Sequence, residues 1–124
     1  MSHGREVLDE LRGPQRSLRE AIPETWAGFA QLHNAAMAPG AVPGHIKELM
    51  AVAIAVSKQC DGCIAAHMRG AVLKGASAAE VAETLGVVML MNGGPTTVYG
   101  PRAWAAYQEF AAATAPKTLS LIHI

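Results

Sequence analysis

Apolar residues recur at helical spacing along most of the chain, and breaks rich in glycine and proline separate the apolar stretches. No stretch alternates apolar and polar residues as a strand does, and no segment repeats. The pattern predicts an all-α fold of about six helices. They are expected at about 5–18, 23–37, 45–57, 60–74, 78–91 and 98–111.

The first two expected helices differ in how strongly their pattern marks a core face. The first is expected to be a short peripheral element, because Gly13 and Pro14 interrupt it. The second carries one stripe at i, i+3, i+4 and i+7, formed by Trp26, Phe29, Ala30 and His33. Such a stripe is the normal signal of a buried helix face, so we expect it to pack in the core.

The third expected helix has a run, 49–56, that is apolar on every side and predicts burial nearly all round. Glu48 adjoins this run, and a carboxylate there lies either at the solvated helix end or in a pair inside the protein. The link to the fourth helix is too short for anything but a tight turn. The two helices are therefore expected to pack as an antiparallel pair.

Local signals also mark where the later helices begin and end. Gly75 suits a left-handed cap after the fourth helix, and Ser77 with Glu80 forms a capping-box pattern ahead of the fifth. A glycine- and proline-rich break follows at 92–95. The last residues, 116–124, show no helical period.

Length and composition restrict the classes of protein to which this chain can belong. The 124 residues suit a single domain, 1–124, and 51% hydrophobic residues exclude disorder of the whole chain. The net charge is zero, which favours neither nucleic acid nor an anionic membrane surface as a partner. With only 16% charged residues, some apolar surface should lie against another copy, so a homo-oligomer is expected. The chain shows no signal peptide or membrane span, which predicts a cytoplasmic protein.

Candidate chemistry gathers around Cys60 and Cys63, the only two cysteines. In a reducing compartment a C-x-x-C pair is typically redox-active or metal-binding rather than a structural staple. Cys60 falls at or beside a helix N-terminus, where a thiol pKa is lowered. His67 follows Cys63 by one turn, so all three side chains share one helix face. The two sulfurs are close enough to form a disulfide.

Glu48 and His67 are expected to meet across the antiparallel pair, because they lie at about the same depth. A buried carboxylate that accepts the imidazole N–H fixes the tautomer and raises the basicity of the other ring nitrogen. This is the usual arrangement of orienting group, base and nucleophile.

Other uses of these residues remain open. Cys60, Cys63 and His67 could supply three zinc ligands, with Glu48 or His45 as the fourth. A redox sensor needs a reactive cysteine pair but has less use for a dedicated proton path. Three histidines, His3, His33 and His45, are each expected to be solvated or to lie at a core margin.

The motif Glu48, Cys60-Asp61-Gly62-Cys63 and His67, followed by Gly75 and the capping box, resembles the alkylhydroperoxidase D-like branch of the carboxymuconolactone decarboxylase superfamily. The resemblance covers about 43–91. It implies an all-helical homo-oligomer, a trimer or hexamer, which reduces a peroxide through the cysteine pair. The best-studied branch has histidine where this chain has Gly62.

The resemblance also implies roles for the four residues. Cys63 is the peroxidatic thiol, Cys60 the resolving thiol, and His67 with Glu48 the proton relay. The helix terminus instead favours Cys60 as the more acidic thiol. We expect Cys63 to attack because His67 is its local base, and Cys60, expected to be the more exposed, to exchange with an external reductant.

The activity that follows is a thiol-dependent peroxidase whose electrons come from an external dithiol or a reductase protein, and which needs no cofactor. A general disulfide reductase is the alternative. Lactone decarboxylation is disfavoured because the decarboxylase branch lacks the cysteine pair.

Overall fold

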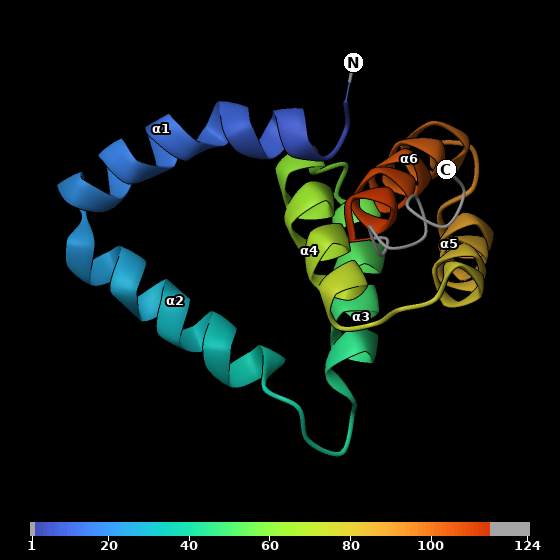
Figure 1. Ribbon diagram of the computed structural model, residues 1–124, viewed down its shortest axis with the longest axis horizontal. Coiled ribbons are helices and arrows are strands. Elements are labelled where there is room, and N and C mark those ends of the chain that lie inside the picture. Colours follow the sequence, from blue (N-terminus) through green and yellow to red (C-terminus); the bar gives the residue numbers. More distant parts are fainter. Residues whose placement is uncertain (1, 115–124) are drawn as a thin grey trace, which may run out of the picture.

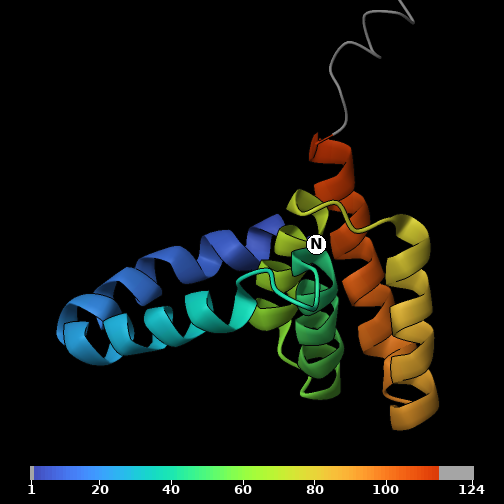
Figure 2. The same ribbon diagram turned by 90° about the horizontal axis from the view of Figure 1, so that it is seen from below.

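The computed structural model describes residues 2–114. Six helices and no strand make up this part of the chain, which confirms the all-α prediction. Four helices form a body, and the first two form an arm that projects from it (Figure 1, Figure 2). The arm consists of α1 (Arg5–Ala21) and α2 (Pro23–Met37). The body consists of α3 (Gly44–Ser57), α4 (Asp61–Leu73), α5 (Ala78–Asn92) and α6 (Thr96–Thr114).

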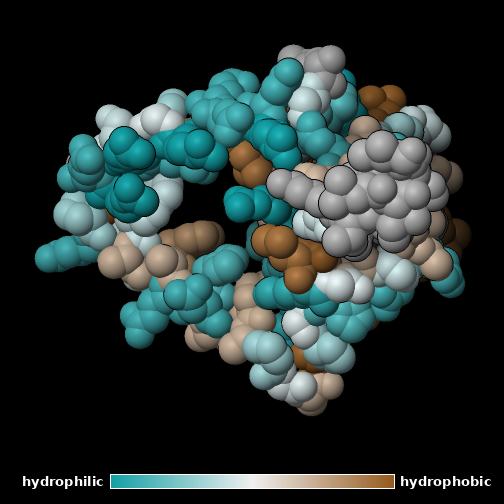
Figure 3. All heavy atoms as spheres, viewed as in Figure 1, coloured by the Kyte–Doolittle hydropathy of each residue, from teal (hydrophilic) through white to brown (hydrophobic). Residues whose placement is uncertain are grey.

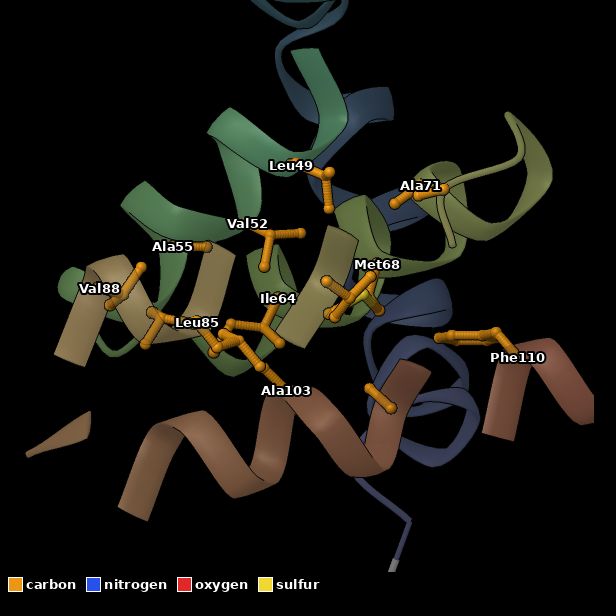
Figure 4. Packing of buried hydrophobic residues seen from close by; sticks show 14 residues of the cluster. Leu49, Val52, Ala55, Ile64, Met68, Ala71, Leu85, Val88, Ala103 and Phe110 are labelled. Atoms are coloured by element: carbon orange, nitrogen blue, oxygen red, sulfur yellow. The ribbon is translucent and has the colours of Figure 1, made fainter. Parts of the chain in front are cut away.

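The buried residues of the hydrophobic core all lie within the body (Figure 4), and Leu8 of α1 packs against them from the arm. Val52 of α3, Ile64 and Met68 of α4 and Val81 of α5 are fully or almost fully buried, and Ala103 and Ala106 of α6 close the core. Small residues on α6 allow that helix to approach α4 and α5 closely. None of the helices described has both the length and the hydropathy that crossing a membrane requires.

The α3–α4 pair packs antiparallel, as predicted, and positions the cysteines. Gln59 takes a left-handed conformation (φ 56°) that reverses the chain directly after α3. The Cys60 N–H then donates to the Ala55 carbonyl (3.0 Å), which fixes the turn. As a result α4 begins at the cysteine motif.

The predicted burial of α3 on nearly every side is wrong for this chain. Met50 and Ile54 are 54% and 58% exposed, because an open apolar groove separates them from α5. The apolar pattern indicates only that burial of this face is energetically favourable. It does not show whether the same chain covers it.

The boundaries of α5 agree with the sequence signals. Ser77 accepts the Glu80 N–H (3.1 Å) and Glu80 accepts the Ser77 N–H (2.9 Å), which confirms the capping box. That backbone hydrogen bond from Ser77 lowers the pKa of Glu80. Gly75 has φ 90°, which confirms the left-handed position after α4. The prediction for 116–124 falls outside the described residues.

Two expectations about the arm are wrong. α1 does not break at Pro14 but continues through it to Ala21. In an exposed helix the proline removes one hydrogen bond, and the freed carbonyl is available to water. The stripe on α2 is not core, since α2 has no buried residue and Phe29 is 68% exposed. The periodicity of apolar residues shows which face of a helix is apolar, but it does not show which part of the protein, if any, packs against that face.

The arm is attached to the body at the start of α1. The Glu109 carboxylate on α6 accepts the Arg5 N–H (2.7 Å) and the Ser2 hydroxyl (2.7 Å). These hydrogen bonds, the Arg5 one foremost, hold the pKa of Glu109 below its ordinary value. Gly4 is buried against Phe110, and a Cβ there would overlap the Glu109 side chain.

Candidate functional site

The cysteine pair lies at the first turn of α4. Cys60 is the N-cap residue, and its Sγ accepts the Cys63 N–H (3.2 Å). The two residues are joined by a disulfide, with their Cα atoms 5.3 Å apart. The Cys60 sulfur therefore lies at the positive end of the α4 dipole, where a thiolate is stabilised.

The two cysteines differ in their access to solvent. Cys63 is exposed, whereas Cys60 is partly buried behind it in the turn. The expectation that Cys60 is the more exposed of the two is therefore wrong. The N-cap position explains this, because a side chain that caps the helix folds back over its first turn.

Glu48 and His67 meet between α3 and α4. Nδ1 of His67 lies 3.2 Å from Oε1 of Glu48, whose side chain is only 5% exposed. A carboxylate only accepts hydrogen bonds, so Nδ1 of a neutral His67 carries the proton and donates it. The unprotonated nitrogen is then Nε2, and the imidazole is ready to accept a proton.

The buried carboxylate fits its place because Gly70 has no side chain. A Cβ at Gly70 would overlap Oε2 of Glu48. Lys74, the C-cap residue directly after α4, brings Nζ to 4.0 Å from Oε1 of the same carboxylate. One face of α4 thus supplies a hydrogen-bond donor and a space to Glu48, and the residue that caps this helix supplies a cation, which together offset the cost of burying the carboxylate.

These groups open into a pocket of about 730 Å³ between the arm and α4, seen as the hollow beside the arm in Figure 3. Glu48, Cys60, Cys63 and His67 all line it. The remaining wall is largely apolar and includes residues of both arm helices, namely Leu11, Gln15, Phe29 and His33. Leu11 packs so closely over Gly62 that a Cβ there would lie 2.8 Å from Cδ1 of Leu11.

His33 is a titratable residue whose place in the site the sequence did not predict. Its ring centroid lies 5.8 Å from that of His67, across the pocket. The available signal was its position one turn after Phe29 on the same stripe of α2. The apolar stripe predicts a core face, whereas in the structure its residues Phe29 and His33 contribute to the pocket wall.

The zinc alternative has either Glu48 or His45 as the fourth ligand, and the structure does not bring His45 to the cysteines. His45 instead places Nε2 at 3.1 Å from Oε2 of Glu80, the capping residue of α5. Within residues 2–114, no group of three or more histidine, cysteine or acidic side chains has a geometry that could hold a metal ion.

The chain is similar to one protein family, to curated relatives and to a solved structure. Residues 23–112 match the model of the carboxymuconolactone decarboxylase family. The chain is 35% identical over 100 residues to the uncharacterized protein H16_B0147 of Cupriavidus necator, covering 81% of this chain and 88% of that protein. It is 33% identical over 81 residues to the uncharacterized protein 4 in the cox locus of Paracoccus denitrificans, covering 65% and 73%.

A solved structure shares the fold. The crystal structure of apo-lpg0406, a carboxymuconolactone decarboxylase family protein from Legionella pneumophila, superposes with a TM-score of 0.83 at 37% identity. The match covers 86% of this chain and 96% of that one. The likeness therefore extends over the body and much of the arm.

Proposed function

The chain belongs to the carboxymuconolactone decarboxylase family, and from this membership and the residues around Cys63 we propose that it is a thiol-dependent peroxidase. The observation that carries the proposal is an accessible cysteine pair that shares one pocket with the hydrogen bond between His67 and the buried Glu48. A disulfide with a structural role alone has no need of a base oriented beside it.

The first step is attack by Cys63 on the peroxide. His67 Nε2 takes the thiol proton, and Glu48 stabilises the imidazolium that forms. The Cys63 sulfur bonds to one peroxide oxygen while the O–O bond breaks, and the other oxygen leaves as an alkoxide that takes up a proton. The products are a sulfenic acid on Cys63 and an alcohol.

The second step closes the disulfide. The Cys60 thiolate attacks the sulfenic sulfur of Cys63, and hydroxide leaves and is protonated to water. The Cα separation of 5.3 Å is within the range that disulfides take, so no large backbone movement is required. Cys60 is held at the helix N-terminus, which favours its thiolate form.

The third step restores both thiols with an external dithiol, or a protein that carries one. Because Cys63 is the exposed sulfur, we expect the incoming thiolate to bond to Cys63 and to release Cys60 as the leaving thiolate. The N–H of Cys63, which points at Cys60 Sγ, stabilises that leaving group. The second thiol of the reductant then releases Cys63.

Trapping the sulfenic acid tests the assignment of the two cysteines. Reduced Cys60→Ser protein is treated with one equivalent of an alkyl hydroperoxide and a sulfenic-acid reagent, and adduct is expected on Cys63. Cys63→Ser is expected to give no adduct and to lose peroxide consumption. An adduct on Cys60 of the Cys63→Ser variant, with the rate retained, reverses the assignment.

Turnover separates the peroxidase from the redox sensor and the disulfide reductase. With excess dithiol and hydroperoxide, a peroxidase consumes many equivalents of hydroperoxide per subunit, whereas a sensor that lacks an efficient reductant stops after one. A disulfide reductase would instead turn over a disulfide substrate and leave the hydroperoxide intact. Loss of carbon dioxide from a lactone acid, independent of the cysteines, would instead support a decarboxylase.

A further inference from the structure

The arm contributes more to the pocket than to the core, against which only Leu8 of its side chains packs. Neither α1 nor α2 has a buried residue, yet both place side chains in the wall opposite the cysteines. Phe29 and His33 are one turn apart on α2, so they face the pocket together. Leu8 of α1 packs against the core but is only partly buried, so most of the apolar surface of the arm faces the pocket or solvent rather than the core.

His33 is the titratable residue that the arm contributes to this wall. Its ring lies 5.8 Å from the ring of His67, and both rings border the space in which Cys63 is exposed. Nδ1 of His33 lies 3.4 Å from Oδ1 of Asn34. A protonated His33 that donates Nδ1–H to Asn34 keeps its Nε2–H for a molecule in the pocket.

The proposed first step needs two proton transfers in opposite directions. His67 accepts the proton of the Cys63 thiol, and the leaving alkoxide must receive one. Two residues of opposite role perform this more readily than one, because a single imidazole must first accept the proton and then present it to a different atom. The other charged groups that face the pocket are Glu48, Arg69 and Lys74.

Arg69 and Lys74 are less suited to that transfer than a histidine. A guanidinium does not release its proton in proteins, and the Lys74 ammonium lies beside the Glu48 carboxylate at 4.0 Å. Histidine changes its charge near neutral pH and is the side chain used most often for proton transfer.

We propose that His33 is the acid that protonates the leaving oxygen of the hydroperoxide. This inference rests on the proposed peroxidase function. In the balanced step, the Cys63 thiolate and the hydroperoxide form the sulfenic acid, the O–O bond breaks, and the His33 proton moves to the departing oxygen to give the alcohol. Neutral His33 then regains a proton from solvent, to which it is exposed.

The test varies the leaving group. Reduced wild-type and His33→Gln proteins are mixed with tert-butyl hydroperoxide, whose alkoxide is strongly basic, and with a peroxyacid, whose carboxylate needs no proton. The rate of Cys63 oxidation is followed under single-turnover conditions. His33→Gln is expected to slow the reaction with tert-butyl hydroperoxide by about 100-fold and that with the peroxyacid by less than about threefold.

His33 is exposed, so the glutamine variant is expected to fold normally. His45→Gln is the matched control, because His45 pairs with Glu80 outside the pocket, and both of its rates should equal those of the wild type. Equal slowing of both oxidants by His33→Gln, or no slowing, overturns the role of His33. If the wild type reacts with neither oxidant, the proposed function itself fails, and this inference falls with it.

Discussion

Glu48 is the only charged side chain that is buried in the described part of the chain, and its surroundings show why that burial is tolerated. His67 donates to it, Lys74 lies nearby, and Gly70 leaves it room. Sequence reasoning identified the first of these partners, because an acid beside an apolar run requires one. It could not identify Gly70, since a missing side chain is informative only once a neighbour is seen to fill its place.

Substitution of Gly70 by alanine should separate Glu48 from His67. The added Cβ would overlap the carboxylate, so Glu48 must turn away while α4, which favours alanine, stays helical. We expect Gly70→Ala to lower the rate of Cys63 oxidation by alkyl hydroperoxide by about tenfold or more, measured by stopped-flow thiol loss.

Gly86→Ala is the control for that substitution. Gly86 is also within a helix, and a Cβ there meets no atom within 4 Å. This variant should keep the wild-type rate and unfold at the same or a slightly higher temperature. An unchanged rate in Gly70→Ala, with helix content retained, would show that the Glu48 contact does not contribute to the chemistry.

At the scale of elements, the helices that carry clear end signals were predicted well. The capping box of α5, Gly75 and the tight turn before α4 are local features, so sequence alone defines them. The errors concern α1, α2 and the exposed face of α3, where the outcome depends on contacts rather than on local preference. Pro14 interrupts a helix in general but not this exposed one, and the stripe on α2 is not core but contributes Phe29 and His33 to a pocket wall.

The junction of α1 with α6 should weaken in acid. The pKa of Glu109 is lowered by its hydrogen bonds with Arg5 and Ser2, so the folded state favours the charged carboxylate. Its stabilisation is therefore present above the ordinary pKa of 4.5 and is lost as pH falls through the lower folded value.

Hydrogen exchange of a peptide from the start of α1 measures this effect. In the wild type, protection corrected for the intrinsic rate should fall below about pH 4.5. In Glu109→Gln it should be low already at pH 7 and show no further step in acid. Identical pH profiles in the two proteins would contradict the assigned role of Glu109.

At the scale of the whole molecule, composition and periodicity were enough to predict the all-α fold but not the projecting arm. Apolar pattern specifies how much surface must leave water, not whether the same chain or another copy covers it. The groove of about 500 Å³ between α3 and α5 illustrates this, since Met50, Ile54, Val87 and Met91 are all more than half exposed.

We expect this groove to be covered by another copy in a homo-oligomer, a trimer or a hexamer. Light scattering of the purified protein should give a mass of about three or six chains. Ile54→Lys, which puts a charge into the groove, should lower that mass, whereas Ala105→Lys on the exposed side of α6 should not. A monomer at micromolar concentration in the wild type would contradict the expectation.

The proposed peroxidase depends on one reaction, in which a peroxide converts the Cys60 and Cys63 thiols into a disulfide. The most direct test is the intact mass and free-thiol count of reduced, metal-free protein before and after one equivalent of an alkyl hydroperoxide. The expected result is a loss of about 2 Da, the mass of the two thiol hydrogens, with no free thiol remaining. Retention of both thiols and of the original mass would contradict it, and a zinc measurement on the protein as purified would then test the metal alternative.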